Sequence, residues 1–406
     1  MQLHPIFSAM RHNRMGATVI AVQIALTLAI LCNALFIIQQ RLALSTRPSG
    51  TDEPDLFAIA NEWVGPAGDP VARVQTDLAL LRSLPEVAGA YVTNAYPLTN
   101  SGSTEILGLD PEQRQGAPAA QYFGDEQTLR TLGLKLIAGR NFRPEEIVNL
   151  GSFDNPHPAG LIITQGLARR LFPGGNALGR GVYLGGQRTK IPIIGVVATL
   201  QVPWTSINGW GSAWSDSSMV VPFRDVTQRT YYIVRSKPGR LSALMKSAPR
   251  RLVALNHDRV IDRVQSFRQA RQEVYRDDRG LAVILVIVCA VLLVVTAFGI
   301  VGLTSYWVAQ RRRQIGIRRA LGATRVQIVR HFQIENLVIA GAGGIAGIAL
   351  GVGANLWMVS SFATARLPTS YLLIGLILVL GLGQLSALRP SLRAAWVPPA
   401  EATRTV

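Results

Sequence analysis

The residues that could do chemistry in this chain lack the spacing that known catalytic and metal sites require. None of the four lysines follows a glycine, so the sequence cannot form a phosphate-binding loop of the GxxxxGK[ST] type. No serine lies in a GxSxG elbow. Acidic pairs occur at Glu145-Glu146 and Asp277-Asp278, but adjacent acids are common in solvated loops. No histidine belongs to an HExxH zinc motif; the five are His4, His12, His157, His257 and His331. We therefore expect a chain without an intrinsic catalytic, cofactor or metal site.

The basic stretch 309–336, AQRRRQIGIRRALGATRVQIVRHFQIEN, is the most informative part of the sequence. Its pattern predicts a helix that extends an apolar run, a stop at Gly322 in a left-handed cap, and a new helix opened by a capping box of Thr324 and Gln327. These signals encode a helix–turn–helix elbow. Positive charge alone would serve membrane topology and anionic lipids, whereas the small apolar turn 320–324 suits docking into another protein's groove. The residues by themselves leave both interpretations open.

Composition and charge placement indicate a membrane protein with a large polar segment. Of the 406 residues, 49% are apolar and only 16% are charged, against about 25% charged in typical soluble domains. The net charge of +17 by itself would suggest a nucleic-acid binder. The positions of the charges along the sequence contradict this. Residues 41–279 carry 28 basic and 22 acidic residues, whereas the rest carries 13 arginines and two glutamates at the ends of apolar runs. This distribution is a membrane-topology signal and argues against nucleic acid.

Four uncharged runs are long enough to cross a bilayer, which needs about 20 apolar residues. The first run is longer than a signal-peptide core and no clear cleavage site follows, which favours an uncleaved anchor. The arginine clusters before run one, between runs two and three and after run four fall on one side if both termini are cytoplasmic. Residues 41–279 are then outside. The predicted spans are 17–39, 280–308, 336–361 and 369–388.

Span three carries Gly343, Gly347 and Gly351, each four residues apart. Such a stripe of small residues allows close helix packing in a membrane. The stripe could form a dimer face or pack within one subunit, and the sequence favours neither.

The pattern of the outer segment predicts a mixed α+β domain, with two lobes as one expected arrangement. Strands are expected at 55–63 and 88–95, with a helix opened by Asp69-Pro70 between them. Residues 161–172 predict a strand passing into a short helix, and 181–199 a hairpin through Gly185-Gly186. We expect an inserted lobe or loops at 100–160. Helices are expected at 240–256 and 261–279, the latter running directly into span two.

The elbow sequence Gln314–Thr324 (QIGIRRALGAT), followed by Glu335 at the start of a glycine-rich apolar helix, resembles the MacB/FtsX family of ABC-transporter permeases. The tail resembles the family's C-terminal signature, and the outer segment resembles the MacB-type periplasmic core. The tail matches are Arg389-Pro390, Arg393-Ala394-Ala395 and Pro398-Pro399-Ala400-Glu401-Ala402. The outer matches are Gly139-Arg140-Asn141-Phe142, Ala168–Pro173, Leu178-Gly179-Arg180 and Ile194–Val197.

This resemblance implies a permease that does not hydrolyse ATP. A separate ABC ATPase, which binds the ATP and Mg²⁺, would dock on the elbow, and its closure would be relayed to the periplasmic domain in efflux or envelope export. Further implied partners are a second permease copy, in a homodimer or heterodimer, a periplasmic adaptor, and membrane lipids. The implied coupling residues are Ile317, Arg318, Ala320, Leu321, Gly322, Ala323, Thr324, Gln327 and Glu335.

The expected fold is an α-helical membrane protein with four transmembrane helices and a large mixed α+β extracytoplasmic domain inserted between helices 1 and 2. The alternatives are a membrane-anchored sensor with a ligand-binding periplasmic domain, and an anchored ectoenzyme. A bacterial inner-membrane location is expected, with both termini cytoplasmic. The expected parts are a cytoplasmic interfacial segment 1–16, span 17–39, periplasmic domain 40–279, span 280–308, elbow 309–335, span 336–361, periplasmic loop 362–368, span 369–388 and cytoplasmic tail 389–406.

Overall fold

The computed structural model describes residues 14–65, 68–112, 115–152, 154, 156–185, 187–204, 214–362 and 365–396. The chain divides into two compact units. The helical unit comprises the chain up to Ala43 together with Asp278 onward, and the α/β unit comprises Leu44–Asp277. The tail motif at 398–402 and Gly186 of the expected hairpin lie outside the described residues.

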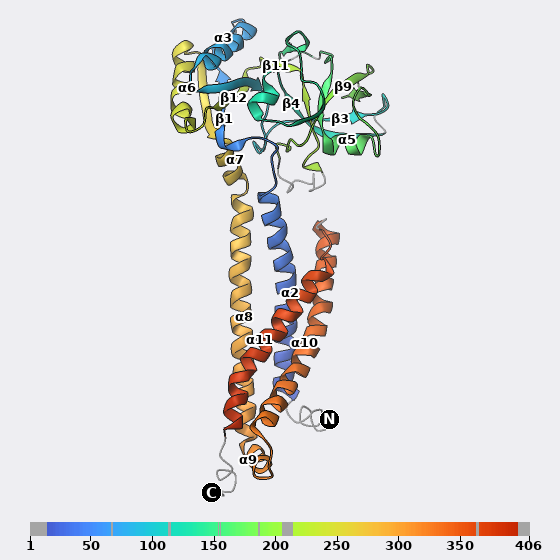
Figure 1. The fold of residues 1–406 in the computed structure, drawn as a ribbon, viewed down its shortest axis with the longest axis vertical. Helices are drawn as coiled ribbons and strands as arrows, with labels where there is room; N and C mark the ends of the chain where they lie inside the picture. Colours follow the sequence, from blue (N-terminus) through green and yellow to red (C-terminus); the bar gives the residue numbers. More distant parts are fainter. Residues whose placement is uncertain are drawn as a thin grey trace. The chain divides into compact units, whose positions relative to one another are not determined.

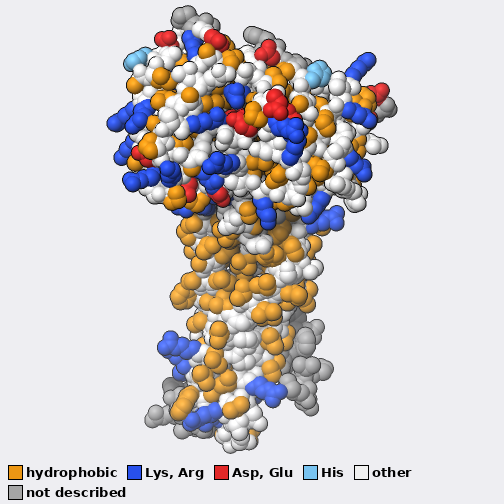
Figure 2. All heavy atoms as spheres, turned by 45° about the horizontal axis from the view of Figure 1, so that its top comes forward, with side chains coloured by type: hydrophobic (Ala, Val, Ile, Leu, Met, Phe, Trp, Pro, Cys, Tyr) orange, Lys and Arg blue, Asp and Glu red, His pale blue; other side chains and the backbone are white. Residues whose placement is uncertain are grey.

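Long apolar helices build the helical unit. They are α2 (Arg14–Ser45), α8 (Arg276–Gln310), α10 (Arg325–Phe362) and α11 (Thr369–Ala395), and the short α9 (Arg312–Ala320) lies at one end of the bundle (Figure 1). Among the described residues, these four long helices have the length and hydropathy to cross a membrane. Each extends beyond the span expected from the sequence, because its helix continues through the charged residues that flank the apolar run. Orange apolar side chains are spread over the visible face of the unit, and the blue side chains towards its lower end are arginines, because this unit contains no lysine (Figure 2).

The glycine stripe of α10 packs on α2 of the same chain. A Cβ atom added at Gly343 would lie 2.7 Å from the carbonyl oxygen of Ala21, and one at Gly347 would lie 2.9 Å from that of Ala25. Gly351 continues the contact one turn further, where its carbonyl oxygen accepts a hydrogen bond of 3.0 Å from Asn33 Nδ2. The close approach of the two backbones therefore needs glycine at 343 and 347, whereas a Cβ atom at Gly351 would meet Ala29 at an ordinary contact distance of 3.4 Å.

The side of α2 that faces α8 carries a polar contact. The hydroxyl oxygens of Thr27 and Thr296 lie 2.9 Å apart, and both side chains are buried. A hydrogen bond between hydroxyls satisfies two polar groups that would otherwise be buried in an apolar bundle. Helix α2 is thus held by close backbone contact on one side and by a polar pair on another.

The first sheet of the α/β unit is antiparallel, with strand order β13-β1-β12-β2. Successive side chains of β1 point to opposite faces of this sheet and pack in two different hydrophobic cores. Phe57 and Ile59 of β1 pack with α3 and α6, whereas Leu56 and Ala58 belong to the core on the other face. The elements are β1 (Leu56–Trp63), α3 (Pro70–Ser83), β2 (Val87–Thr93), β12 (Arg229–Ser236), α6 (Leu241–Leu255) and β13 (Arg259–Ser266).

The second sheet has seven strands in the order β5-β9-β7-β10-β4-β3-β8, and an additional β8–β9 pairing joins its last strand to its second. This pairing closes the sheet and leaves β5 outside the ring. The strands are β3 (Ser103–Gly108), β4 (Gly116–Phe123), β5 (Leu136–Gly139), β7 (Leu161–Thr164), β8 (Gly181–Leu184), β9 (Ile191–Val197) and β10 (Ser218–Val221). Helices α4 (Thr128–Leu132) and α5 (Gln165–Leu171) and the pair β6 (Val148–Leu150) and β11 (Phe223–Asp225) complete the unit, with 3₁₀ turns at Glu53–Asp55 and Pro144–Glu146.

Several local predictions are confirmed. The strands near 55–63 and 88–95, the helix after Asp69, the strand–helix at 161–172, the β8–β9 hairpin and the helix at 240–256 are all present. The carboxylate of Asp69 accepts hydrogen bonds from the amides of Val71 and Ala72, which is the expected N-cap.

The stretch 100–160 belongs to an insertion, as one of the two alternatives expected, but the insertion is longer and is not made of loops. All strands of the second sheet, from β3 to β10, lie in sequence between β2 and β12 of the first sheet. Strands β3 and β4 of this stretch occupy the same sheet as β8 and β10, which come from later in the chain. The many glycines and prolines lie at the turns between short strands. Local composition therefore placed the end of the insertion too early, because the pairing of β3 with β8 and of β4 with β10 extends the sheet to Val221.

The expected helix at 261–279 is also wrong in its first part. Residues 259–266 form β13, which pairs antiparallel with β1. A capping box of Ser266 and Gln269 then opens α7 (Phe267–Val274), and Tyr275 separates α7 from α8. The backbone of this segment forms hydrogen bonds with β1 at the edge of the sheet. Helical periodicity in the sequence carries no information about such a partner.

Arg271 of α7 fastens the chain that follows α2. Its Nη1 atom donates to the carbonyl oxygens of Ser45 at 3.1 Å and Arg47 at 2.9 Å, and its Nε atom donates to the Glu53 carboxylate at 2.9 Å. Both charged side chains are mostly buried. This arginine thereby ties the segment where the chain enters the α/β unit to α7.

We predict that Gly347→Leu destabilises the chain by about 1–3 kcal/mol, because the new side chain would overlap the backbone of Ala25. Gly353→Leu is the matched control, since a Cβ atom there meets nothing within 4 Å. The measurement is the melting temperature of each purified variant in detergent. Equal melting temperatures for the two variants would contradict close packing of the stripe on α2.

Candidate functional site

The elbow (residues 309–335) is built by local backbone signals. Helix α9 ends at Ala320, Gly322 adopts a φ of +96°, and the amide of Ala323 donates to the carbonyl oxygen of Arg318 at 3.0 Å. This is a glycine-terminated Schellman motif. The Thr324 amide donates to Gln327 Oε1 at 2.9 Å, and the Gln327 amide donates to Thr324 Oγ1 at 3.3 Å. The predicted left-handed stop and capping box are confirmed.

One detail of the elbow differs from the prediction. Helix α8 does not continue to Gly322 but ends at Gln310, and Arg311 lies between α8 and α9 with φ −101° and ψ 15°. Arg311 is also the residue whose guanidinium reaches across to α10. The junction between α8 and α9 thus lies at a residue whose ion pair is with Glu335 of α10, 24 positions later. Local sequence patterns do not predict a contact of this kind.

The turn exposes three large apolar side chains that no other part of the described chain covers. Leu321 is 84% exposed, Val326 is 74% exposed and Ile317 is 48% exposed. Among the other predicted elbow residues, Arg318, Ala320, Gly322, Thr324 and Gln327 are also exposed and Ala323 is half-buried. A cluster of solvent-facing leucine, valine and isoleucine is typical of a surface that another protein covers.

Glu335 lies apart from this exposed turn and is 2% exposed. Its carboxylate accepts hydrogen bonds of 2.8 and 3.1 Å from Arg311 Nη1. The structure therefore places Glu335 as the partner that holds the α8–α9 junction against α10. It does not place Glu335 on the surface with the other predicted elbow residues.

The elbow rests on residues that the sequence did not single out. A small core beneath it contains two residues from the end of α11, and Arg319 Nη1 donates to the Ala395 carbonyl oxygen at 3.1 Å. The Arg325 guanidinium lies 3.8 Å from the ring centre of Trp396. Helical spacing could have found Ile328 and Phe332, but nothing local links them to α11. The core consists of Val308, Ile315, Ile328, Phe332, Ala394 and Ala395.

A hollow of about 210 Å³ lies in the inner angle of the elbow, between α9 and the first turns of α10. Its floor is apolar and its remaining lining is basic or amide, with no carboxylate among the lining residues. These are Arg311, Gln314, Ile315, Arg318, Ala323, Gln327, Ile328, His331 and Phe332.

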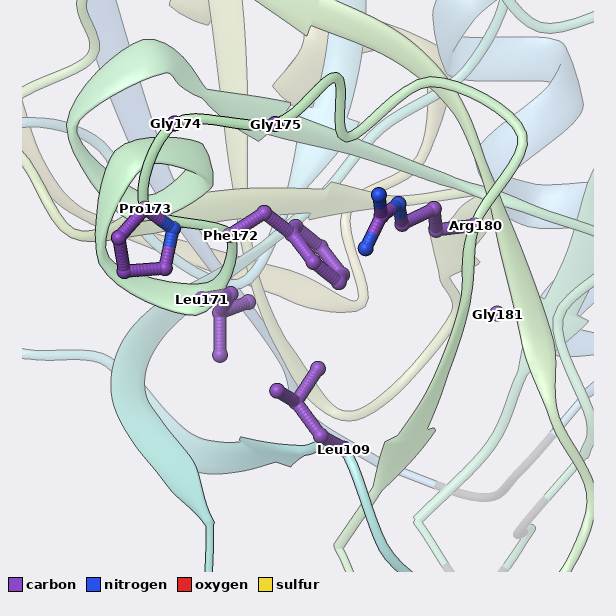
Figure 3. A pocket seen from close by; sticks show the side chains of 8 residues that line it. All are labelled: Leu109, Leu171, Phe172, Pro173, Gly174, Gly175, Arg180 and Gly181. Atoms are coloured by element: carbon purple, nitrogen blue, oxygen red, sulfur yellow. The ribbon is translucent and has the colours of Figure 1, made fainter.

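The α/β unit has a second recess, open and about 650 Å³ in volume. Figure 3 shows Arg180 directed towards the Phe172 ring, with Leu109 and Leu171 beside it. The guanidinium lies 4.9 Å from the ring centre. The other lining residues are Pro173, Gly174, Gly175 and Gly181, so the recess offers apolar surface and one cation.

Perturbed carboxylates in the α/β unit have structural partners. Burial raises the pKa of Asp216 to about 6 although the Leu200 amide donates to it, and burial raises the pKa of Asp225 to about 6 although the Thr227 amide donates to it. Burial also raises the pKa of Asp125, opposed by the Arg82 guanidinium at 2.8 Å. Within the part of the chain that the structure describes, no three His, Cys, Asp or Glu side chains gather as a metal site would require.

Comparison with known proteins identifies the family. The model of the MacB-like periplasmic core domain matches residues 16–251, which is more than half of the chain, and the model of the FtsX-like permease C-terminal domain matches residues 286–399. Together the matched regions define a transporter permease with a large extracytoplasmic domain. The chain belongs to the MacB/FtsX-like family of ABC-transporter permeases.

Curated relatives agree with this assignment. The macrolide export ATP-binding/permease protein MacB of Chromobacterium violaceum is 26% identical over 242 residues, which is 58% of this chain and 35% of that protein. The uncharacterized ABC transporter permease YknZ of Bacillus subtilis is 29% identical over 285 residues, 67% of this chain and 66% of that protein. The alignment with SyfD of Pseudomonas syringae, a probable syringafactin export protein, covers 74% of this chain and 42% of that protein at 24% identity.

The chain thus spans less than half the length of the MacB and SyfD proteins that it matches. Among solved structures, the periplasmic region of MacB from Actinobacillus actinomycetemcomitans aligns with a TM-score of 0.35 and 17% identity, covering 55% of this chain and 94% of that one.

We predict that Glu335→Gln destabilises the chain by about 3 kcal/mol, because it leaves the Arg311 guanidinium buried without its counter-charge. The double variant Arg311→Met/Glu335→Gln should recover most of the loss, since it removes the unpaired charge. Thermal unfolding in detergent measures both. If the double variant is less stable than Glu335→Gln alone, the ion pair is not the reason for the loss.

Proposed function

We propose that this chain is the permease subunit of an ABC transporter whose ATPase is a separate protein. The elbow docks on that ATPase, and the closure of the ATPase on ATP is relayed through the helices to the α/β unit. The observation that carries the proposal is the elbow itself. It presents Ile317, Leu321 and Val326 to solvent at the start of a helix that continues without interruption to Phe362.

A continuous helix suits the relay of movement. Helix α10 is fixed to the α8–α9 junction by the Arg311–Glu335 ion pair and to α2 by the glycine stripe. A displacement of the elbow is therefore imposed on α10 as a rigid element, since packed helices shift between discrete arrangements and do not deform continuously. ATP and Mg²⁺ belong to the partner in this mechanism, and the permease contributes no step of hydrolysis.

The same proposal includes a location and an orientation. The chain lies in the bacterial inner membrane with both termini and the elbow in the cytoplasm, and the α/β unit lies in the periplasm. Its support is the arginine-rich sequence around the elbow, which contains seven arginines between 311 and 330 and no acidic residue in that stretch.

We further propose that the transporter acts in export, with two permease copies and a periplasmic adaptor. MacB and SyfD carry export in their names, and the chain aligns with the permease portion of such proteins. Two copies would present two elbows to the two ATPase subunits.

We predict that Leu321→Glu reduces recovery of the ATPase roughly tenfold or more in a detergent pull-down from native membranes, because the contact would then bury an unpaired charge. Leu255→Glu, at a 43% exposed leucine of the α/β unit, is the control and should leave recovery unchanged. Both variants should insert normally. Full ATPase recovery with Leu321→Glu would overturn docking at the elbow, and failure of the wild type to retain any ATPase would favour a sensor.

The orientation predicts opposite thiol reactivity at two exposed sites. A cysteine at Ser101 should react with a membrane-impermeant thiol reagent in intact spheroplasts, whereas a cysteine at Thr324 should react only after the membrane is opened. The native Cys32 and Cys289 are buried and would be replaced by alanine as background. The reverse pattern of labelling would place the elbow outside.

A further inference from the structure

The hollow of the elbow has a positive charge that no residue in the described part of the chain fully balances. Its cationic lining residues are Arg311 and Arg318, and none of its nine lining residues is acidic. Glu335 neutralises Arg311 from the side, at 2.8 Å. The Arg318 guanidinium, on the exposed face of α9, forms no ion pair with a described carboxylate within 4 Å. The interior of the elbow therefore favours an anionic occupant.

The two walls of the hollow are regular helix faces. Arg311, Gln314 and Arg318 follow one another along α9 and its start, and Gln327 and His331 are one turn apart on α10. The apolar residues Ile315, Ile328 and Phe332 are buried and form the floor. An occupant thus meets hydrogen-bond donors at the sides and hydrocarbon at the base, which matches a carboxylate on an aliphatic stem.

The size and position of the hollow limit what enters it. At about 210 Å³ the hollow has room for a side chain. Ala323 of the turn lines it, and the exposed Leu321 and Val326 lie beside the same turn. A protein that covers the apolar turn would bring a side chain to this opening.

We propose that the hollow is an anchor site for an acidic side chain of the ATPase, with Arg318 as its counter-charge. This inference rests on the function proposed above and adds the chemistry of the contact. The apolar turn supplies contact area, whereas the carboxylate in the hollow selects a partner with an acid at the matching position and fixes its register. An arginine is suited to this task because its planar guanidinium binds a carboxylate through two hydrogen bonds.

The first test is charge reversal in the full-length protein. The probe is the ATPase that co-purifies with the wild type from native membranes. Arg318→Glu should reduce its recovery roughly tenfold or more, and Arg318→Lys should retain a part of it. Arg312→Glu, at an exposed arginine of α9 outside the hollow, is the control and should have little effect.

The outcomes separate this inference from the function on which it rests. If Leu321→Glu abolishes ATPase recovery but Arg318→Glu does not, docking stands and the anchor is wrong. If neither variant reduces recovery, docking at the elbow fails as well. Equal losses with Arg318→Glu and Arg312→Glu would show a general effect of basic charge and would also overturn the anchor.

The second test follows occupancy directly. A cysteine is placed at Ala323 in the background without Cys32 and Cys289. It should react with a small thiol reagent in the purified permease, and the rate of this reaction should fall at least tenfold when the ATPase is bound. Protection that is present without the ATPase, or that depends on anionic lipid in nanodiscs, would assign the hollow to a lipid headgroup or to this chain's own tail and would overturn the proposal.

Discussion

The close packing of α10 on α2 is the interaction on which the helical unit depends. Apolar helices in a bilayer gain nothing from leaving water, so their association relies on van der Waals contact and a few polar bonds. The glycines at 343, 347 and 351 bring the two backbones together over two turns, and Asn33 adds a hydrogen bond to the Gly351 carbonyl. A larger side chain at position 343 or 347 would push the two helices apart.

That packing also determines what the elbow can do. Because α10 is one helix from Arg325 to Phe362, its first turn and its glycine stripe move together. The buried pair of Arg311 and Glu335 attaches the α8–α9 junction to the same helix. Replacing both residues of such a pair by apolar ones costs little stability. While both charges are present, however, their hydrogen bonds hold the two segments in one geometry. In the proposed transporter, the elbow would therefore transmit displacement to α10 with little local bending.

In the α/β unit, the segment that enters the unit is held to its last short helix, α7. Arg271 donates to two backbone carbonyls just after α2 and to the Glu53 carboxylate, so α7 and the entering segment form one connected base. Beyond this base, the β8–β9 pairing closes the larger sheet. Closure removes exposed edges from most of its strands.

The sequence by itself determined the features that depend on neighbouring residues. Uncharged runs of sufficient length predicted the four long helices, and Gly322 with the Thr324–Gln327 box predicted the turn of the elbow, because hydropathy and capping act within a few residues. Only the tertiary structure decided that the glycine stripe faces α2, that residues 259–266 form a strand beside β1, and that Glu335 is the buried partner of Arg311. Each of these is a contact between residues distant in sequence, whose free energy depends on which surfaces meet, and no local pattern carries that information.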